Sequence, residues 1–99
     1  MAIVRITIRT FQNPEHAQLF LAVSNQTIPA LEEKGIKVTA KIATTQNKKH
    51  EVISVWECDD EAHMNMVRSV IAKFSALPNS LSPKEISFQS DIVKDIETA

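Results

Sequence analysis

The chain has 99 residues, of which 43% are hydrophobic and 23% are charged, and its formal net charge is −1. This length and balance indicate a single globular domain with a modest core, and they argue against intrinsic disorder. Nucleic-acid-binding domains usually carry an excess of basic residues, so the charge balance also argues against a nucleic-acid partner.

The cysteine content and the apolar runs bear on where the protein acts. Cys58 is the only cysteine, so no intramolecular disulfide is possible and we expect a reducing compartment, the cytoplasm. The N-terminal segment "MAIVRITIRT" carries Arg5 and Arg9 within its apolar run and lacks the pattern of a signal peptide. No run approaches the ~20 apolar residues that span a bilayer, so we expect no membrane partner.

The first element is predicted to be a half-buried strand. In residues 3–10, "IVRITIRT", apolar and polar side chains alternate with the period of two that is typical of strands. Asn13 and Pro14 follow this strand. Asparagine is favoured at the N-cap of a helix, and proline is tolerated in the first turn, so a helix is expected to begin here.

Pro29 lies within the continuation of this helix and is expected to break it near residues 27–28. A short second piece, residues 29–34, then ends at Gly35, the only glycine in the chain. Gly35 suits the left-handed conformation that closes many helices.

Two further strands and a helix are predicted in the second half. Residues 36–43 alternate again, and the polar turn "TTQNKK" should let them pair antiparallel with residues 50–57. Asp59 or Asp60 is then expected to cap a helix over residues 60–76. The apolar stripe of this helix is expected to comprise Ala62 or His63, Met66, Val67, Val70, Ile71 and Phe74.

The chain closes with a strand at residues 84–92 and a tail at residues 93–99, so one domain is expected over residues 1–92. The order β-α-β-β-α-β predicts an α+β domain of the ferredoxin-like class, a four-stranded antiparallel sheet with two helices on one face. Because apolar strand faces usually pack beneath helices, we expect Ile6 and Ile8 to face the helices. The opposite sheet face is then expected to carry Arg5, Thr7, Arg9, Lys37, Thr39, Lys41, His50, Val52, Ser54, Trp56, Glu85, Ser87 and Gln89.

Three interpretations of that opposite face are open. It could face solvent, as one side of an antiparallel sheet often does, although the apolar side chains of Val52 and Trp56 would then be exposed to water. It could bind RNA, but the RNA-recognition domain stacks bases on paired aromatic residues, and Trp56 has no aromatic partner there. It could instead be covered by a second copy of the chain.

A sequence resemblance favours the third interpretation. The strand end "SVWE", the acidic turn after it and the helix opening "EAHMNMVRS" resemble the dimeric α/β-barrel superfamily, in particular its antibiotic-biosynthesis-monooxygenase group and their stress-responsive relatives. The topology corresponds over residues 3–92 and the motif over residues 55–69. The resemblance implies a homodimer in which two sheets pack face to face, often with a small hydrophobic or aromatic ligand between helices and sheet. Some members are cofactor-independent oxygenases, some degrade haem, and some are isomerases or cyclases.

The resemblance also implies roles for particular residues. Trp56 matches a tryptophan that often lines the family's pocket, and it is interpreted as a pocket wall or as an interface residue. The family frequently has a histidine nine or ten positions later, where this chain has Asn65 and Met66, and His63 is the nearest histidine.

The first strand departs from one branch of the family. Haem-degrading relatives have an asparagine in it, whereas its polar residues here are Arg5, Thr7 and Arg9, so haem is not expected.

The candidate site follows from these residues. His63 and Asn65 are the candidates for catalysis. The candidates for ligand binding are Trp56, Arg5, Arg9, Thr7, Lys37 and Lys41. The cationic members of this set are expected to be solvated, to form interface salt bridges, or to bind an anion such as a carboxylate or an acidic phenol.

No metal site is expected, because Asp59 and His63 offer too few ligands at helical spacing. Cys58 is not expected to be a nucleophile, because acids surround it and no histidine base is clearly placed beside it.

Two functions are therefore predicted. The first is a small dimeric enzyme without a cofactor, of the monooxygenase, isomerase or lyase type, acting on a small aromatic or carboxylated metabolite. The second is a non-catalytic ligand-binding or stress-related dimer with the same pocket.

Overall fold

The computed structural model describes residues 2–74 and 77–99. Its elements in chain order are β1 (Ile3–Thr10), α1 (Pro14–Ser24), α2 (Thr27–Glu33), β2 (Thr39–Thr45), β3 (Lys48–Cys58), α3 (Glu61–Phe74), the 3-10 helix η1 (Asn79–Leu81) and β4 (Lys84–Asp91). The predicted order is confirmed, with α1 and α2 together in the place of the first helix.

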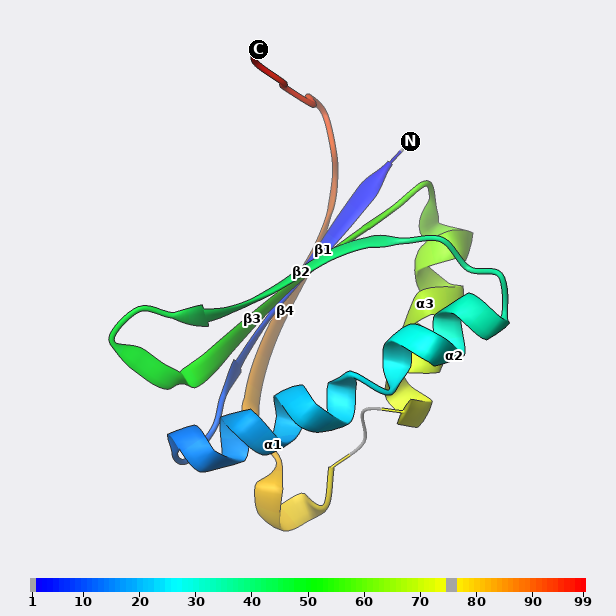
Figure 1. The fold of residues 1–99 in the computed structure, drawn as a ribbon. Coiled ribbons are helices and arrows are strands. Elements are labelled where there is room, and N and C mark those ends of the chain that lie inside the picture. Colours follow the sequence, from blue (N-terminus) through cyan, green and yellow to red (C-terminus); the bar gives the residue numbers. More distant parts are fainter. Residues whose placement is uncertain (1, 75–76) are drawn as a thin grey trace.

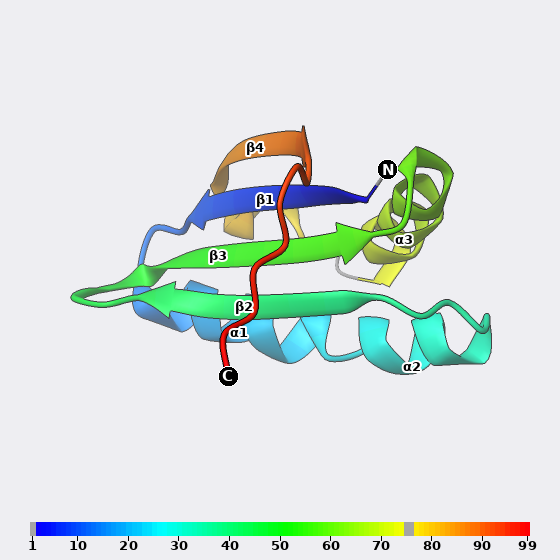
Figure 2. The same cartoon turned by 90° about the horizontal axis from the view of Figure 1, so that it is seen from above.

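The strands form one antiparallel sheet in the order β2-β3-β1-β4. Figure 1 shows this sheet nearly edge-on, with all three α-helices on one side. Figure 2 looks onto the other side, where the C-terminal tail passes in front of the strands. We call this second side the open face. From the strand register, its central side chains are Val4, Ile6, Ile8, Lys41, Ala43, Ile53, Val55, Ile86 and Phe88, and its ends carry Thr10, Thr39, Glu51, Glu57, Lys84 and Ser90.

The helix boundaries follow local chemistry. The Asn13 side chain accepts a hydrogen bond from the His16 backbone N–H (2.9 Å), so Asn13 is the N-cap of α1, as predicted. The break between α1 and α2 falls at residues 25–26, two residues before the predicted position. Pro29 lies in the first turn of α2, where its missing N–H leaves no hydrogen bond unmade. Gly35 has φ +69°, which confirms the predicted left-handed position.

The third helix is capped by Asp60 and buries a different set of residues from the predicted one. Asp60 accepts from the His63 backbone N–H (2.8 Å), and α3 follows. Met64 is fully buried, whereas Met66 is 53% exposed, so the prediction that Met66 packs inward is wrong. The predicted last residues of this helix, 75–76, lie outside the described residues.

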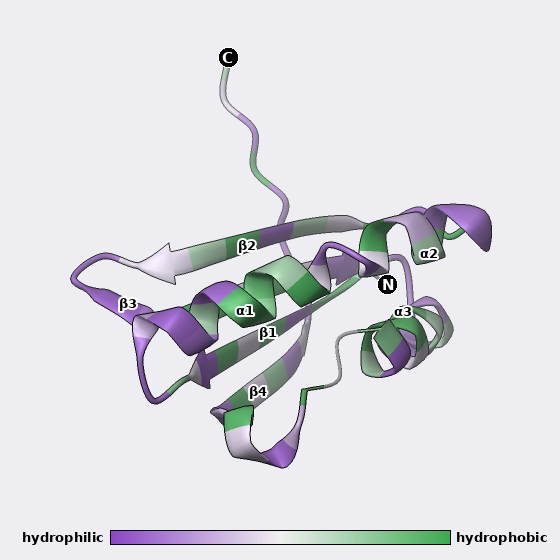
Figure 3. Ribbon diagram, turned by 60° about the horizontal axis from the view of Figure 1, so that its bottom comes forward, coloured by the Kyte–Doolittle hydropathy of each residue, from purple (hydrophilic) through white to green (hydrophobic). Residues whose placement is uncertain are grey.

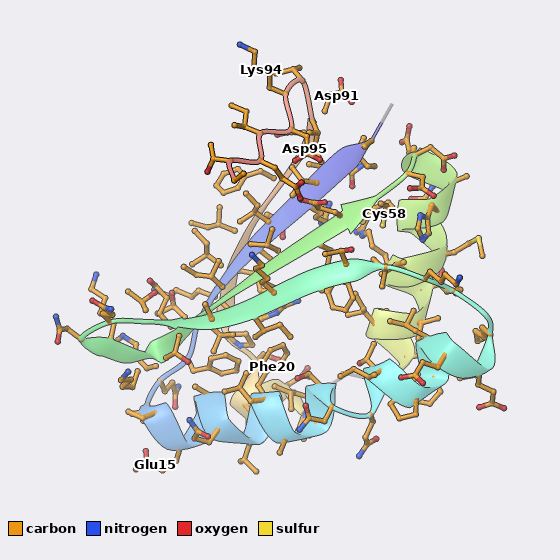
Figure 4. All side chains as sticks on the ribbon, turned by 45° about the horizontal axis from the view of Figure 1, so that its top comes forward. Glu15, Phe20, Cys58, Asp91, Lys94 and Asp95 are labelled. Carbon is orange, nitrogen blue, oxygen red and sulfur yellow. The ribbon has the colours of Figure 1, made fainter. Side chains whose placement is uncertain are left out.

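Two apolar clusters hold the helices on the sheet. The first joins α2 and α3 to the sheet and comprises Ile3, Ala30, Leu31, Cys58, Met64, Val67 and Val70. The second lies under α1 and comprises Phe11, Ala17, Phe20 and Val52. Figure 4 shows Phe20 reaching from α1 toward the sheet, whereas Glu15 of the same helix points away from it.

The polar face of β1 lies under the helices, which reverses the predicted orientation. The guanidinium carbon of Arg9 lies 4.8 Å from the centroid of the Phe20 ring of α1. In the β1–β3 register Arg5 is opposite Trp56 and Arg9 is opposite Val52, so these side chains share one face. The grouping of these polar side chains is therefore confirmed, but their predicted placement on the side away from the helices is wrong.

The second strand, β2, has the predicted orientation relative to the helices. Ala40 pairs with Trp56 and Ile42 with Ser54, so the apolar residues of β2 face the helices as predicted. Lys41 consequently lies on the open face, and Lys37 precedes the strand. The predicted cationic row is therefore divided between the two sides of the sheet. Alternation reveals which residues of a strand share a face, but it does not fix the phase of one strand against another.

The open face is apolar across its centre. In Figure 3 the strands show alternating hydrophobic and hydrophilic bands along their length. Ile86 and Phe88 of β4 are 59% and 50% exposed on the open face. The tail adds Val93 and Ile96, which are also largely exposed. An apolar surface of this kind usually marks a contact site.

Candidate functional site

A cavity of about 370 Å³ lies between the sheet and the helices. We call it the large cavity. Strands β1, β3 and β4 form its floor, and α1, α3 and the segment around η1 form its walls. Its lining residues are Arg5, Thr7, Arg9, Phe20, Trp56, Met64, Arg68, Ile71, Ala72, Leu77, Ser82, Pro83, Glu85 and Ser87. It therefore draws on both apolar clusters and on the polar face of the sheet.

Arg9 is fixed at one end of the floor. Its Nε lies 2.9 Å from Oε1 of Glu85, and its guanidinium also donates to the Ser54 hydroxyl at 3.1 Å. Burial lowers the pKa of Arg9, and the charge of Glu85 partly opposes this. The Phe20 ring covers the guanidinium from the α1 side, in cation–π geometry. Arg9 and Glu85 are neighbours in the β1–β4 register, so the sheet itself sets this ion pair.

The rest of the floor carries neutral hydrogen-bonding groups and a second arginine. The hydroxyls of Thr7 and Ser87 are 3.0 Å apart, and Arg5 donates to Oε1 of Gln89 at 3.3 Å. Arg68 projects from α3 into the same cavity. The floor thus offers both hydrogen-bond donors and positive charge to a bound molecule.

The apolar wall is built around Trp56 and α3. Trp56 is partly buried against the first apolar cluster, and it lines both the large cavity and a smaller one of about 50 Å³ beside it. Met64, Arg68 and Ile71 follow one another at helical spacing of four and three, so α3 presents them on one side. A flat apolar group could contact this wall while its polar atoms reach the floor.

The structure brings some of the predicted site residues together and separates others. Arg5, Thr7, Arg9 and Trp56 all line the large cavity. In the described part of the chain, neither this cavity nor the smaller one is lined by the other predicted residues: Lys37, Lys41, His63 and Asn65.

His63 is engaged at the start of α3. Its Nδ1 accepts from the Asp59 backbone N–H at 3.1 Å, and its own backbone N–H donates to Asp60. Asn65 is exposed on the same helix, and its carbonyl accepts from the Ser69 hydroxyl. These contacts describe a helix start and not a site that converges with Trp56.

One charged residue of the cavity, Arg68, was not predicted, although it lies four residues after the buried Met64 and so on the same helical side. Glu85 was predicted to share a face with Arg9, and this grouping is confirmed, but the face lies under the helices and not away from them.

Cys58 is buried at the end of β3, and its thiol lies 3.8 Å from the sulfur of Met64. Burial raises the pKa of this thiol, and Asp59 and Asp60 raise it further. The side chain is therefore a packing residue that favours the protonated form.

The described residues offer neither a metal site nor a membrane-spanning helix. Among residues 2–74 and 77–99, no three His, Cys, Asp or Glu side chains are grouped so that they could hold a metal ion. None of the helices in this part of the chain has both the length and the apolar character needed to cross a membrane.

Comparison with known proteins identifies the fold. No family model and no curated protein matches the chain. Among solved structures, a dimeric ferredoxin-like protein from an uncultured marine organism is similar, with a TM-score of 0.75 and 15% identity over 99% of this chain and 93% of that one. The chain has a ferredoxin-like fold. This confirms the fold implied by the resemblance to the dimeric α/β-barrel superfamily.

Two other similar structures carry functional names. SnoaB from Streptomyces nogalater, a cofactor-independent oxygenase solved in a mutant form, has a TM-score of 0.69 and 7% identity over 98% of both chains. An antibiotic biosynthesis monooxygenase has a TM-score of 0.67 and 12% identity over 95% of this chain and 100% of that one. At these identities the likeness concerns the fold alone.

Proposed function

We propose that this protein is a homodimeric α/β barrel that binds a small aromatic or carboxylated molecule in the large cavity. One observation carries the proposal: strands β1 and β4 turn Arg9 and Glu85 toward the helices and Ile6 and Phe88 away from them. In an isolated domain this arrangement is unfavourable in two ways. Within the described residues Arg5 faces the cavity without an ion pair, and Phe88 is left half exposed. A ligand in the cavity and a second copy on the open face would remove both costs.

The open face favours a second copy of the chain as its occupant. Its centre is apolar and continuous across three strands, with Ile6 beside Val55 on one side and beside Phe88 on the other. The description of one similar structure as dimeric supports the same arrangement. In this arrangement the open face forms the contact between copies, and the helix side of the sheet binds the ligand.

Catalysis is the second candidate function. The names of two similar structures favour a cofactor-independent monooxygenase, and an isomerase or lyase remains the related alternative. The residues predicted for catalysis, His63 and Asn65, lie away from the cavity. Among the described lining residues, Glu85 is the carboxylate available for proton transfer, and it is paired with Arg9. The geometry therefore supports binding more directly than chemistry.

Native mass spectrometry of freshly purified protein tests the proposal. We expect a dimer that retains a small molecule, and we expect Ala72→Phe to abolish retention because the new ring would occupy the cavity. Ala62→Phe is the matched control, because Ala62 is an exposed alanine of the same helix outside the cavity lining. A monomer, or equal retention by both variants, would contradict the proposal.

The retained molecule also separates the two candidate functions. It is incubated with the purified protein in air and followed by mass spectrometry, with boiled protein as the control. A new product that forms only with native protein supports an enzyme, and an unchanged mass supports a binding protein.

A further inference from the structure

The charges around the large cavity do not balance. Three arginines line it, Arg5, Arg9 and Arg68, and among the described lining residues Glu85 is the only acid. Glu85 is already paired with Arg9 at 2.9 Å. Two positive charges, on Arg5 and Arg68, are thus left facing the cavity.

Arg5 and Arg68 reach the cavity from different elements. Arg5 comes from β1 on the floor and is partly buried, and Arg68 comes from the α3 wall and is exposed. Arg5 makes a hydrogen bond to the neutral amide of Gln89, and no ion pair to either arginine is formed within residues 2–74 and 77–99. Burial lowers the pKa of Arg5, the positive charge of Arg68 lowers it further, and the charge of Glu85 opposes this, so the two guanidinium groups repel each other.

The repulsion between these two cations destabilises the empty cavity, and the same two charges favour the binding of an anion there. A carboxylate has two oxygens and can accept from two guanidinium groups, and charge-assisted hydrogen bonds of this kind are roughly twice as strong as neutral ones. Apolar groups lie beside the two arginines, including Trp56 and Ile71. A ligand that fits both parts has an anionic end and a flat apolar body.

We infer that Arg5 and Arg68 together hold the carboxylate of an aromatic acid, whose ring packs against Trp56 and Ile71. This inference rests on the proposed use of the large cavity for binding and narrows its ligand to the anionic class. Arg68 is then the residue that determines specificity, because it supplies charge from α3 whereas Arg9 is neutralised by Glu85.

The test compares acids with their neutral amides. Benzoate and 2-naphthoate, with benzamide and 2-naphthamide, are titrated into the purified protein and followed by calorimetry and by the fluorescence of Trp56, the only tryptophan in the chain. We expect at least one acid to bind roughly tenfold more tightly than its amide, since one charge-assisted contact can supply about that factor. Added salt should weaken binding of the acid and not of the amide.

Variants of α3 assign the effect to Arg68. Arg68→Met should reduce affinity for the acid to about that of the amide, while Lys73→Met, which removes an exposed cation of the same helix outside the cavity lining, should leave it unchanged. Arg68→Met and Lys73→Met should both keep the melting temperature of the wild type, because both side chains are exposed. Unchanged melting temperatures keep the test independent of any folding defect.

The contrary outcomes are distinct. Equal binding of acids and amides, or equal acid affinity in Arg68→Met and wild type, would overturn the anion site and leave the cavity as a binding site. Failure of every acid and amide to bind would overturn the inference together with the proposed function.

Discussion

At the scale of single residues, Arg9 illustrates how the sheet tolerates a charge beneath its helices. Its side chain is 15% exposed, and Glu85, Ser54 and the Phe20 ring contact it from three directions. A buried guanidinium without such partners would be strongly unfavourable. The ion pair with Glu85 therefore contributes to folding as well as to the shape of the cavity.

We predict that Glu85→Gln lowers the free energy of unfolding by roughly 1 kcal/mol. Glutamine can still accept a hydrogen bond from Arg9, but it cannot offset the positive charge. Urea unfolding followed by Trp56 fluorescence measures the change. Glu97→Gln, in the exposed tail, removes the same charge without a described partner and should change stability by less than about 0.5 kcal/mol. Equal losses in the two variants would contradict a specific role for the Arg9 pair.

Cys58 gives a prediction about pH. Its pKa is raised in the folded protein, so folding favours the thiol over the thiolate. This contribution to stability is fully present below the pKa of the unfolded thiol, and it is lost as pH rises through the raised folded value. Between about pH 7 and pH 10, wild-type protein should therefore lose more stability than Cys58→Ala. The comparison uses the slope of stability against pH, because the alanine variant also loses packing. Parallel slopes would show that the thiol is not the group responsible.

At the scale of elements, the start of α3 shows what the sequence could predict and why. Asp60 provides the side-chain cap, and His63 closes the turn from the other side by accepting from the Asp59 N–H. The acidic turn was predicted as a cap because only local spacing is needed for that inference. His63 was also considered for catalysis, and that role depends on where the cavity lies, which local spacing does not determine.

Asp60→Ala is expected to lower stability by about 1 kcal/mol, because it leaves the His63 backbone N–H without its partner. Asp59→Ala is the matched control, since the Asp59 side chain is almost fully exposed and only approaches His63 at 3.8 Å. We expect this control to differ from wild type by less than about 0.5 kcal/mol. Thermal unfolding of both variants measures these changes in stability. A larger loss of stability in Asp59→Ala than in Asp60→Ala would contradict the assignment of Asp60 as the cap.

The first strand marks the limit of prediction at this scale. Its alternation predicts a strand and groups Arg5, Thr7 and Arg9 on one face, and both predictions are confirmed. The same alternation is equally compatible with either face lying under the helices. The usual rule, apolar side toward the helices, fails here because the helices enclose a polar cavity. Arg68 was missed for a related reason, since its importance appears only when α3 is placed above β1.

At the scale of the whole molecule, the sheet differs from that of a simple two-layer domain, in which the apolar side faces the helices and the polar side faces water. The helix side holds a charged cavity, and the open face exposes Ile86 and Phe88. Figure 1 shows that α1, α2 and α3 lie on the other side of the sheet from the open face, and Figure 2 shows the tail passing in front of that face. The predicted cationic row would have made this face hydrophilic. Because the cationic row is divided between the two sides of the sheet, Lys41 lies on the open face on the edge strand β2, and the centre of this face is apolar. An apolar centre suits face-to-face packing of two sheets better than exposure to water.

We predict that Phe88→Glu converts the protein to a monomer at micromolar concentration, because a charge buried between two packed sheets would lack a partner. Light scattering coupled to size-exclusion chromatography measures the mass. Leu19→Glu is the matched control: Leu19 is 48% exposed, close to the 50% of Phe88, but it lies on α1, on the helix side of the sheet. The control should remain a dimer, and circular dichroism should show that both variants keep their helices and strands. If Leu19→Glu dissociates the protein and Phe88→Glu does not, the contact between copies lies on the helices and the open face has another role.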